Sequence, residues 1–215
     1  SSIKRQFYGR VLSDGSISPD GQSFAIGVFD DYANGKKSEI EIYGIKNGKL
    51  ALKCRWQHTV YKRIQRRVIE LQYDPTGKWL AVGDVAGKVS IFEVANLPCN
   101  QSSPSARFGL KGKNGSEPFL NYARKIAFSR DGSMLAVLGT VKEPVVGTQK
   151  QYTQSVKIWR WTGQAFQYAQ EVTVYNTTLH KYFSTIDDIQ FSNDCKTIAY
   201  TSSNAIKLDS LLVCD

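Results

Sequence analysis

The chain has 215 residues, of which 41 % are apolar and 22 % are charged, and its formal net charge is +9. These values are ordinary for a folded domain with one substantial core, and they exclude a fibrous or intrinsically disordered chain. No run of residues approaches the roughly 18 apolar positions that a membrane helix needs, and residues 1–10 lack the apolar segment of a signal peptide, so we expect neither.

Four cysteines are widely separated and form no CxxC pair, which argues against a zinc site or a thioredoxin-like motif. They are Cys54, Cys99, Cys195 and Cys214. We expect thiols rather than disulfides, and therefore an intracellular location, cytoplasmic or nuclear.

Four stretches of the chain align with one another in a single register: residues 15–28, 71–84, 126–140 and 189–203. A glycine marks the shared turn position in three copies and a cysteine marks it in the last: Gly21, Gly77, Gly132 and Cys195. Four residues later every copy has an alanine, preceded by a large apolar residue. A repeat with this period is typical of solenoids and propellers.

The second copy shows the predicted elements most clearly. Residues 68–74 alternate apolar and polar side chains, which predicts a half-buried strand. Residues 74–78 contain proline and glycine and predict a turn. The apolar run 79–84 predicts a strand that is covered on both faces, and residues 89–94 alternate again. Three antiparallel strands are therefore expected within fewer than thirty residues.

The other copies follow the same scheme, with third strands expected at 39–45, 155–161 and 205–210 and fourth strands at 50–56 and 165–173. In the second copy a polar loop insertion, 95–119, takes the place of a clear fourth strand, and a smaller insertion covers 142–154. No amphipathic helix is apparent. We expect one domain, 1–215, with repeats near 10–56, 68–119, 122–175 and 185–215.

Three strings carry a resemblance to a known family: FSRDGSMLAV at 128–137, YDPTGKWLAVGDVAGKVSIF at 73–92 and SVKIW at 155–159. They resemble WD40 repeats, and the first copy also resembles the TolB-type propeller repeat. The resemblance implies an all-β fold, a β-propeller of four-stranded blades, with about four blades in this chain. The tryptophan–aspartate pair of the family is missing, because Arg160 follows Trp159.

The family places a structural histidine shortly before the first strand of a blade, and His58 and His180 occur at such places. The resemblance therefore implies structural roles inside the blades for six residues: His58, His180, Trp159, Gly21, Gly77 and Gly132. Propellers of the family usually have about seven blades. Three arrangements follow: a segment of a larger propeller, which we favour, a half-ring that another chain completes, or a closed ring of four.

Both histidines also permit catalytic interpretations. His180 with Asp187 or Asp188 could form a base with its orienting carboxylate, and Cys54 with His58 could form a nucleophile and its base. The repeat already accounts for both histidines, and no serine or cysteine lies in a G-x-S-x-G context. We therefore expect no enzyme activity, no metal and no cofactor.

The most function-like feature is a basic cluster between the first and second copies, formed by Lys62, Arg63, Arg66 and Arg67 next to Tyr61. With Trp161, these residues are the candidate partner-binding set, because Trp, Tyr and Arg dominate binding hot spots. For the cluster itself we favour a solvated, highly charged loop over a ligand site; if it binds a ligand, we expect an acidic peptide or RNA. The sequence as a whole favours a non-catalytic protein–protein interaction scaffold or adaptor in a multi-subunit assembly. The alternatives are an RNA-binding module that uses 62–67, and a propeller hydrolase or TolB-like periplasmic accessory protein.

Overall fold

A computed structural model describes residues 10–30, 37–57, 68–85, 87–96, 105–109, 122–142, 152–177, 188–202 and 205–210. Within them the chain forms four antiparallel sheets, each made of strands that are consecutive in the sequence. The first blade contains β1 (Arg10–Ile17), β2 (Ser23–Asp30), β3 (Lys37–Lys46) and β4 (Lys49–Gln57). The second contains β5 (Val68–Tyr73), β6 (Trp79–Asp84), β7 (Lys88–Glu93) and β8 (Ala106–Gly109).

The third blade contains β9 (Tyr122–Phe128), β10 (Met134–Lys142), β11 (Tyr152–Trp161) and β12 (Phe166–Thr177). The fourth contains three strands, β13 (Ile189–Phe191), β14 (Thr197–Ser202) and β15 (Ala205–Ser210). The one helix in the described part of the chain is a single 3-10 turn, Val94–Asn96, so no helix there has the length and apolar character to cross a membrane.

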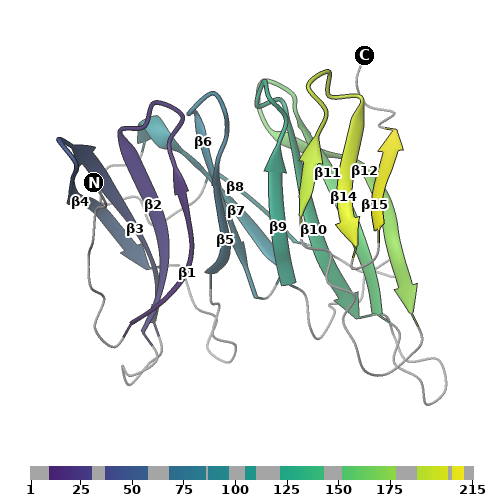
Figure 1. Ribbon diagram of the computed structural model, residues 1–215, viewed down its shortest axis with the longest axis horizontal. Coiled ribbons are helices and arrows are strands. Elements are labelled where there is room, and N and C mark those ends of the chain that lie inside the picture. Colours follow the sequence, from purple (N-terminus) through teal and green to yellow (C-terminus); the bar gives the residue numbers. More distant parts are fainter. Residues whose placement is uncertain are drawn as a thin grey trace.

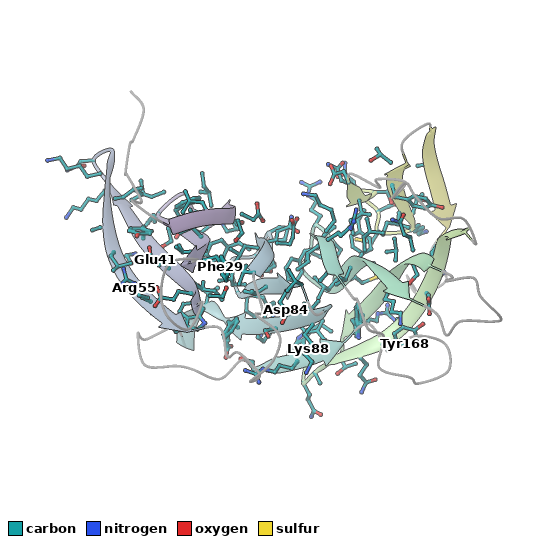
Figure 2. The ribbon with its side chains drawn as sticks, turned by 90° about the horizontal axis from the view of Figure 1, so that it is seen from below. Phe29, Glu41, Arg55, Asp84, Lys88 and Tyr168 are labelled. Carbon is teal, nitrogen blue, oxygen red and sulfur yellow. The ribbon has the colours of Figure 1, made fainter. Side chains whose placement is uncertain are left out.

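The four blades stand side by side in chain order (Figure 1), and their first strands contact one another in sequence, β1 with β5, β5 with β9 and β9 with β13. Viewed at right angles, the blades follow an open arc, with the first and fourth blades at its two ends (Figure 2). We call the row of first strands the inner wall. Within the described residues the four blades do not close on themselves, which is the arrangement of a partial propeller and not that of a closed ring of four.

Each blade has one face for its predecessor and one for its successor. The aligned alanine and the apolar pair of the third strand point to the next blade, as Ala25, Ile40 and Ile42 do when they pack on Leu71 and Val82. The large residue before each alanine points to the preceding blade. Since side chains alternate across a strand, adjacent positions serve opposite joints. The apolar core of the molecule is therefore a series of layers between blades.

The two ends of the arc differ. On the outward face of the first blade Ile26, Val28 and Tyr43 are buried, and the buried carboxylate of Glu41 accepts hydrogen bonds from the Tyr43 hydroxyl and pairs with Arg55 Nη2 at 2.7 Å (Figure 2). On the outward face of the fourth blade, the apolar side chains are more exposed to solvent than on that of the first. Leu208 is 69 % exposed, and Ala199 is half-buried, although its counterparts Ala25, Ala81 and Ala136 are fully buried.

Local rules explain most strand boundaries. The three aligned glycines have φ between +69° and +75°, the left-handed region that glycine enters without strain, and each ends a tight turn between the first and second strands. The predicted double coverage of 79–84 is confirmed, since all six residues of β6 are buried. The loop predicted at 95–119 is wrong at Ala106–Gly109, which form β8 by pairing with β7.

Candidate partner-binding surfaces at the joint of the third and fourth blades

The sequence-predicted site residues are only partly placed by the structure. The basic cluster with Tyr61, and both histidines, lie outside the described residues. Trp159 is buried in the core between the second and third blades, and Trp161 is half-buried at the edge of the same core. Cys54 is a thiol with 3 % exposure inside the first joint, so it cannot serve as a solvent-accessible nucleophile without rearrangement.

Trp161 belongs to an aromatic cluster that joins the second and third blades. Its ring centroid lies 4.8 Å from that of Trp79 and 5.1 Å from that of Phe166. The Lys78 ammonium lies 4.9 Å from the centroid of Trp79 and 5.2 Å from that of Trp161, within cation–π range. Because its ring already has these contacts, Trp161 stabilises the joint and presents only part of its surface to a partner.

The turns between first and second strands all lie along the upper edge of the molecule in Figure 1, and we call this edge the turn-side face. The second and third turns each pack against the turn of the preceding blade. A Cβ placed on Gly77 would lie 3.8 Å from Pro19, and one placed on Gly132 would lie 2.6 Å from Asp74 Oδ2. The fourth turn carries Cys195 at the glycine position, with φ +60°, and its Sγ lies 4.0 Å from Asp131 Oδ1.

A groove of about 610 Å³ opens on the turn-side face between the third and fourth turns. Its lining includes three cations, two carboxylates and a thiol: Arg130, Arg160, Lys196, Asp131, Asp194 and Cys195. Arg130 and Lys196 are exposed. The groove is thus open to solvent and has an excess of one positive charge.

The two carboxylates of the groove are held by their own turns. Asp131 Oδ1 accepts hydrogen bonds from the Ser129 hydroxyl at 2.6 Å and from the Ser133 main-chain N–H at 3.0 Å. Burial alone would raise the pKa of Asp131, but these hydrogen bonds outweigh it and hold the pKa below the ordinary value. The hydrogen bond from Ser192, followed by that from the Lys196 N–H, lowers the pKa of Asp194 in the same way. Both acids accept hydrogen bonds within their turns, so the cations of the groove are the groups best placed to meet a ligand.

On the inner wall, one repeat position carries charge in all four blades. Seven residues before the turn position lie Asp14, Glu70, Lys125 and Asp188. Asp14 Oδ2 accepts a hydrogen bond from the Leu71 N–H at 2.7 Å, across the first joint. Glu70 accepts one from the Ile126 N–H across the second joint, and its Oε1 lies 3.3 Å from Lys125 Nζ.

Sequence reasoning missed this charged position, and a signal for it was present. The aligned stretches begin one residue later, at 15, 71, 126 and 189, so extending the alignment by a single residue would have found it. The cations of the groove carried no such signal, because they come from different repeat positions and meet only when two blades pack. Within the described residues, no group of three or more His, Cys, Asp or Glu side chains could hold a metal ion.

Comparison with known proteins gives the fold and nothing finer. No family model and no curated protein matches the chain. Among 714 matching solved chains is Sqt1 from Chaetomium thermophilum, a WD40-repeat protein, with a TM-score of 0.58 over 94 % of this chain. The fold is a WD40-like β-propeller arc. The sequence identity to Sqt1 is 14 %, and the matched part is 44 % of that structure, so this chain spans less than half of its length.

Proposed function

We propose that this chain is a non-catalytic protein–protein interaction module of a larger assembly, and that the turn-side groove between its third and fourth blades binds an acidic peptide segment of a partner. The observation that carries the proposal is the basic groove in which both carboxylates already accept hydrogen bonds from their own turns. An arriving carboxylate would meet the exposed cations Arg130 and Lys196, and it would share Lys196 with the nearby carboxylate of Asp194.

The scaffold suits such a role because the groove is formed on turns held by packed strands. The Ser129–Gly132 and Ser192–Cys195 turns each close with a main-chain hydrogen bond, of 2.9 Å in both cases. Binding on a preorganised surface has a small ordering cost, so weak individual contacts can give useful affinity. The reducing, intracellular setting expected from the cysteines and an assembly with other subunits are part of the same proposal.

The exposed outward face of the fourth blade supports the assembly. Leu208 and Ala199 lie where the other blades receive a successor, and the apolar surface there is open among the described residues. The three preceding blades bury the corresponding alanine completely. A neighbouring subunit or a further blade that covers this face would gain hydrophobic burial.

The groove is tested by fluorescence anisotropy with a short, labelled, glutamate-rich peptide and its glutamine counterpart. The double variant Arg130→Glu/Lys196→Glu should weaken binding of the glutamate peptide by about tenfold or more, and added salt should have the same tendency. Lys46→Glu/Lys49→Glu makes an equal change in net charge at an exposed turn of the first blade and should have little effect. If both variants lose the same affinity for the glutamate peptide, or if the glutamine peptide binds equally well, the groove is not the binding site of an acidic peptide.

The same measurement with a labelled oligouridine tests the RNA-binding alternative. If the chain binds the oligouridine more tightly than the glutamate peptide, and neutralising Lys62, Arg63, Arg66 and Arg67 abolishes this binding, the basic cluster is an RNA site. If the oligouridine binds more weakly, the protein-partner proposal stands.

A further inference from the structure

The inner wall changes its chemistry between the third and fourth blades. At the first joint, Asp14 and Ser16 accept hydrogen bonds from the Leu71 and Tyr73 N–H groups, the second at 3.0 Å. At the second joint Glu70 accepts the corresponding bond. At the third joint the same two repeat positions hold Lys125 and Ala127, and neither side chain can accept a hydrogen bond.

The first strand of the fourth blade is consequently bonded in another way. The Ile189 N–H donates to Oδ1 of its own neighbour, Asp188, at 3.0 Å. Asp188 is exposed, and its own N–H donates to Thr201 Oγ1 at 3.1 Å. The carboxylate thus stays on the inner wall, where its charge acts on Lys125 of the third blade.

A cavity of about 300 Å³ lies at this joint, bounded by β5, β9 and β13. This volume is at the lower end of the range of ligand pockets, about 300 to 1,000 Å³. Its polar lining is Glu70, Gln72, Lys125, Asp188 and Gln190, and its apolar lining includes Phe128 and Phe191. Mixed walls of this kind can hold a side chain that has an apolar stem and a polar end.

Gln72 adds an independent observation. Its Oε1 is buried in the cavity wall and accepts no hydrogen bond from any described residue. At the first joint the equivalent residue, Ser16, accepts the Tyr73 N–H. A buried acceptor without a donor costs free energy, so a ligand that brings a donor is favoured, provided that the Gln72 amide turns toward the cavity to expose its oxygen.

The charges on this wall favour a cation. Asp14, Glu70 and Asp188 contribute three carboxyl groups, whereas Lys125 is the ammonium that faces them and it is already bonded to Glu70. Burial, and then the charge of Asp14, raise the pKa of Glu70 to about 7, as expected where negative charge is in excess. A ligand carboxylate could supply the acceptor that the third joint lacks, but inside the cavity it would have to approach Glu70 and Asp188.

We propose that the cavity between β5, β9 and β13 binds the guanidinium of an arginine side chain from a partner protein. The Asp188 carboxylate would accept its charged hydrogen bonds, Gln72 Oε1 would accept another, and Phe128 and Phe191 would flank the stem. Guanidinium fits this role because it is planar, carries five donors and is less strongly hydrated than an ammonium group. The site lies on a different surface from the turn-side groove and takes the opposite charge, so it does not depend on the proposed function.

The test uses NMR of the isotope-labelled chain titrated with N-acetyl-arginine amide. The side-chain amide resonances of Gln72 and Gln190 should shift in a saturable way. N-acetyl-citrulline amide, which keeps the shape and removes the charge, should bind at least about fivefold more weakly, the value of one ion pair at a partly exposed site. N-acetyl-lysine amide should bind less tightly than the arginine compound, and N-acetyl-glutamate amide should leave both resonances unchanged.

Two variants locate the site. Asp188→Asn should weaken arginine binding by about fivefold and Gln72→Leu by a smaller factor. Asp20→Asn, at an exposed carboxylate of the first turn that lines neither the groove nor the cavity, is the matched control and should bind like the original chain. Retained dispersion of the main-chain resonances shows that each variant is folded. Equal binding of arginine and citrulline, saturation by glutamate, or unchanged binding in both Asp188→Asn and Gln72→Leu would overturn the proposal.

Discussion

The joint between the second and third blades and the joint between the third and fourth are built on the same repeat, yet one is closed and the other is open at both rims. In the closed joint, a Cβ placed on Gly83 would lie 2.9 Å from the Ala123 side chain, and the third turn presses against Asp74. The aromatic cluster of Trp79 and Trp161 seals the turn side. In the open joint, a groove lies on the turn side and a cavity on the inner wall.

Both joints nevertheless have a continuous apolar core. Ile126 and Leu135 lie in the core of the closed joint, and Ala136 and Ile198 lie in that of the open one. The difference is confined to the rims, where Lys125, Ala127 and Cys195 replace the residue types found at the other copies. A repeat protein can therefore gain a binding surface at one joint while the layer that stabilises it stays intact.

The largest expected effect comes from crowding the closed joint with Gly132→Ala. The new Cβ would need left-handed backbone at φ +70° and would meet Asp74 Oδ2, which Thr76 holds in place while the Trp79 N–H is bonded to Oδ1 at 2.6 Å. We expect the free energy of unfolding to fall by about 3 kcal/mol, from backbone strain and overpacking together.

Gly21→Ala is the matched control for that change. Gly21 has nearly the same φ, +69°, but nothing lies within 4 Å of the position of its Cβ. It should lose only the strain part, about 1 kcal/mol. Urea denaturation followed by tryptophan fluorescence measures both variants. Equal losses would show that the turns do not press on one another.

The second prediction concerns the pH dependence of the inner wall. Because the pKa of Glu70 in the folded chain is about 7, above the ordinary 4.5, its contribution to stability is complete below pH 4.5 and is lost as the pH rises through 7. Glu70→Gln should remove this loss, making the fall in unfolding free energy between pH 5 and pH 8 smaller by about 2 kcal/mol.

The free energies of unfolding of both chains, measured by denaturation at pH 5 and pH 8, give that difference. The contributions of groups that titrate alike in the two chains, the histidines included, cancel in it. Asp14→Asn is the second arm. It removes a negative neighbour of Glu70 and should make the fall in unfolding free energy between pH 5 and pH 8 smaller without abolishing it. An identical pH dependence in Glu70→Gln and the original chain would contradict the burial of a carboxyl group at this position.

The strands and turns could be predicted because their signals are local. Alternation of side chains and a glycine at the shared turn position determine β5, β6 and β7 almost to the residue. The strand β8 could not be predicted, since Ala106–Gly109 lie in a polar insertion and become a strand by pairing with β7. Pairing across a long connection leaves no periodic signal in so short a segment.

The candidate site was less accessible from the sequence. Arg130 and Lys196 become one surface only because the turns of two blades lie next to each other, and single-sequence patterns do not report such neighbours. Its residue type makes Trp161 a candidate binding residue, and its contacts with Trp79 and Phe166 give it a packing role as well. The role of the basic cluster remains a prediction, because those residues lie outside the described ones.

The third prediction measures that packing role. Trp161→Ala should lower the free energy of unfolding by about 2 kcal/mol, less than a fully buried tryptophan would, because Trp161 is half-buried and loses ring contacts with Trp79 and Phe166. Tyr168→Ala is the control: Tyr168 is 56 % exposed and should contribute about 0.5 kcal/mol through its contact with Trp159. Thermal unfolding followed by circular dichroism compares the two variants. If the Trp161→Ala chain is as stable as the original, the contacts of Trp161 do not stabilise the joint.

The smallest expected effect comes from making the open joint resemble the closed one at its turn. Cys195→Gly places the residue type of the other three copies at φ +60°, and the relief of strain exceeds the greater chain entropy that glycine gains on unfolding. We expect the free energy of unfolding to rise by about 0.5 kcal/mol, and the Sγ contact with Asp131 to be lost. Denaturant midpoints measured with an unchanged slope check the first effect. Because Arg130 and Lys196 are untouched, affinity for the glutamate peptide should stay the same, whereas a decrease would mean that the cysteine side chain is itself part of the binding surface.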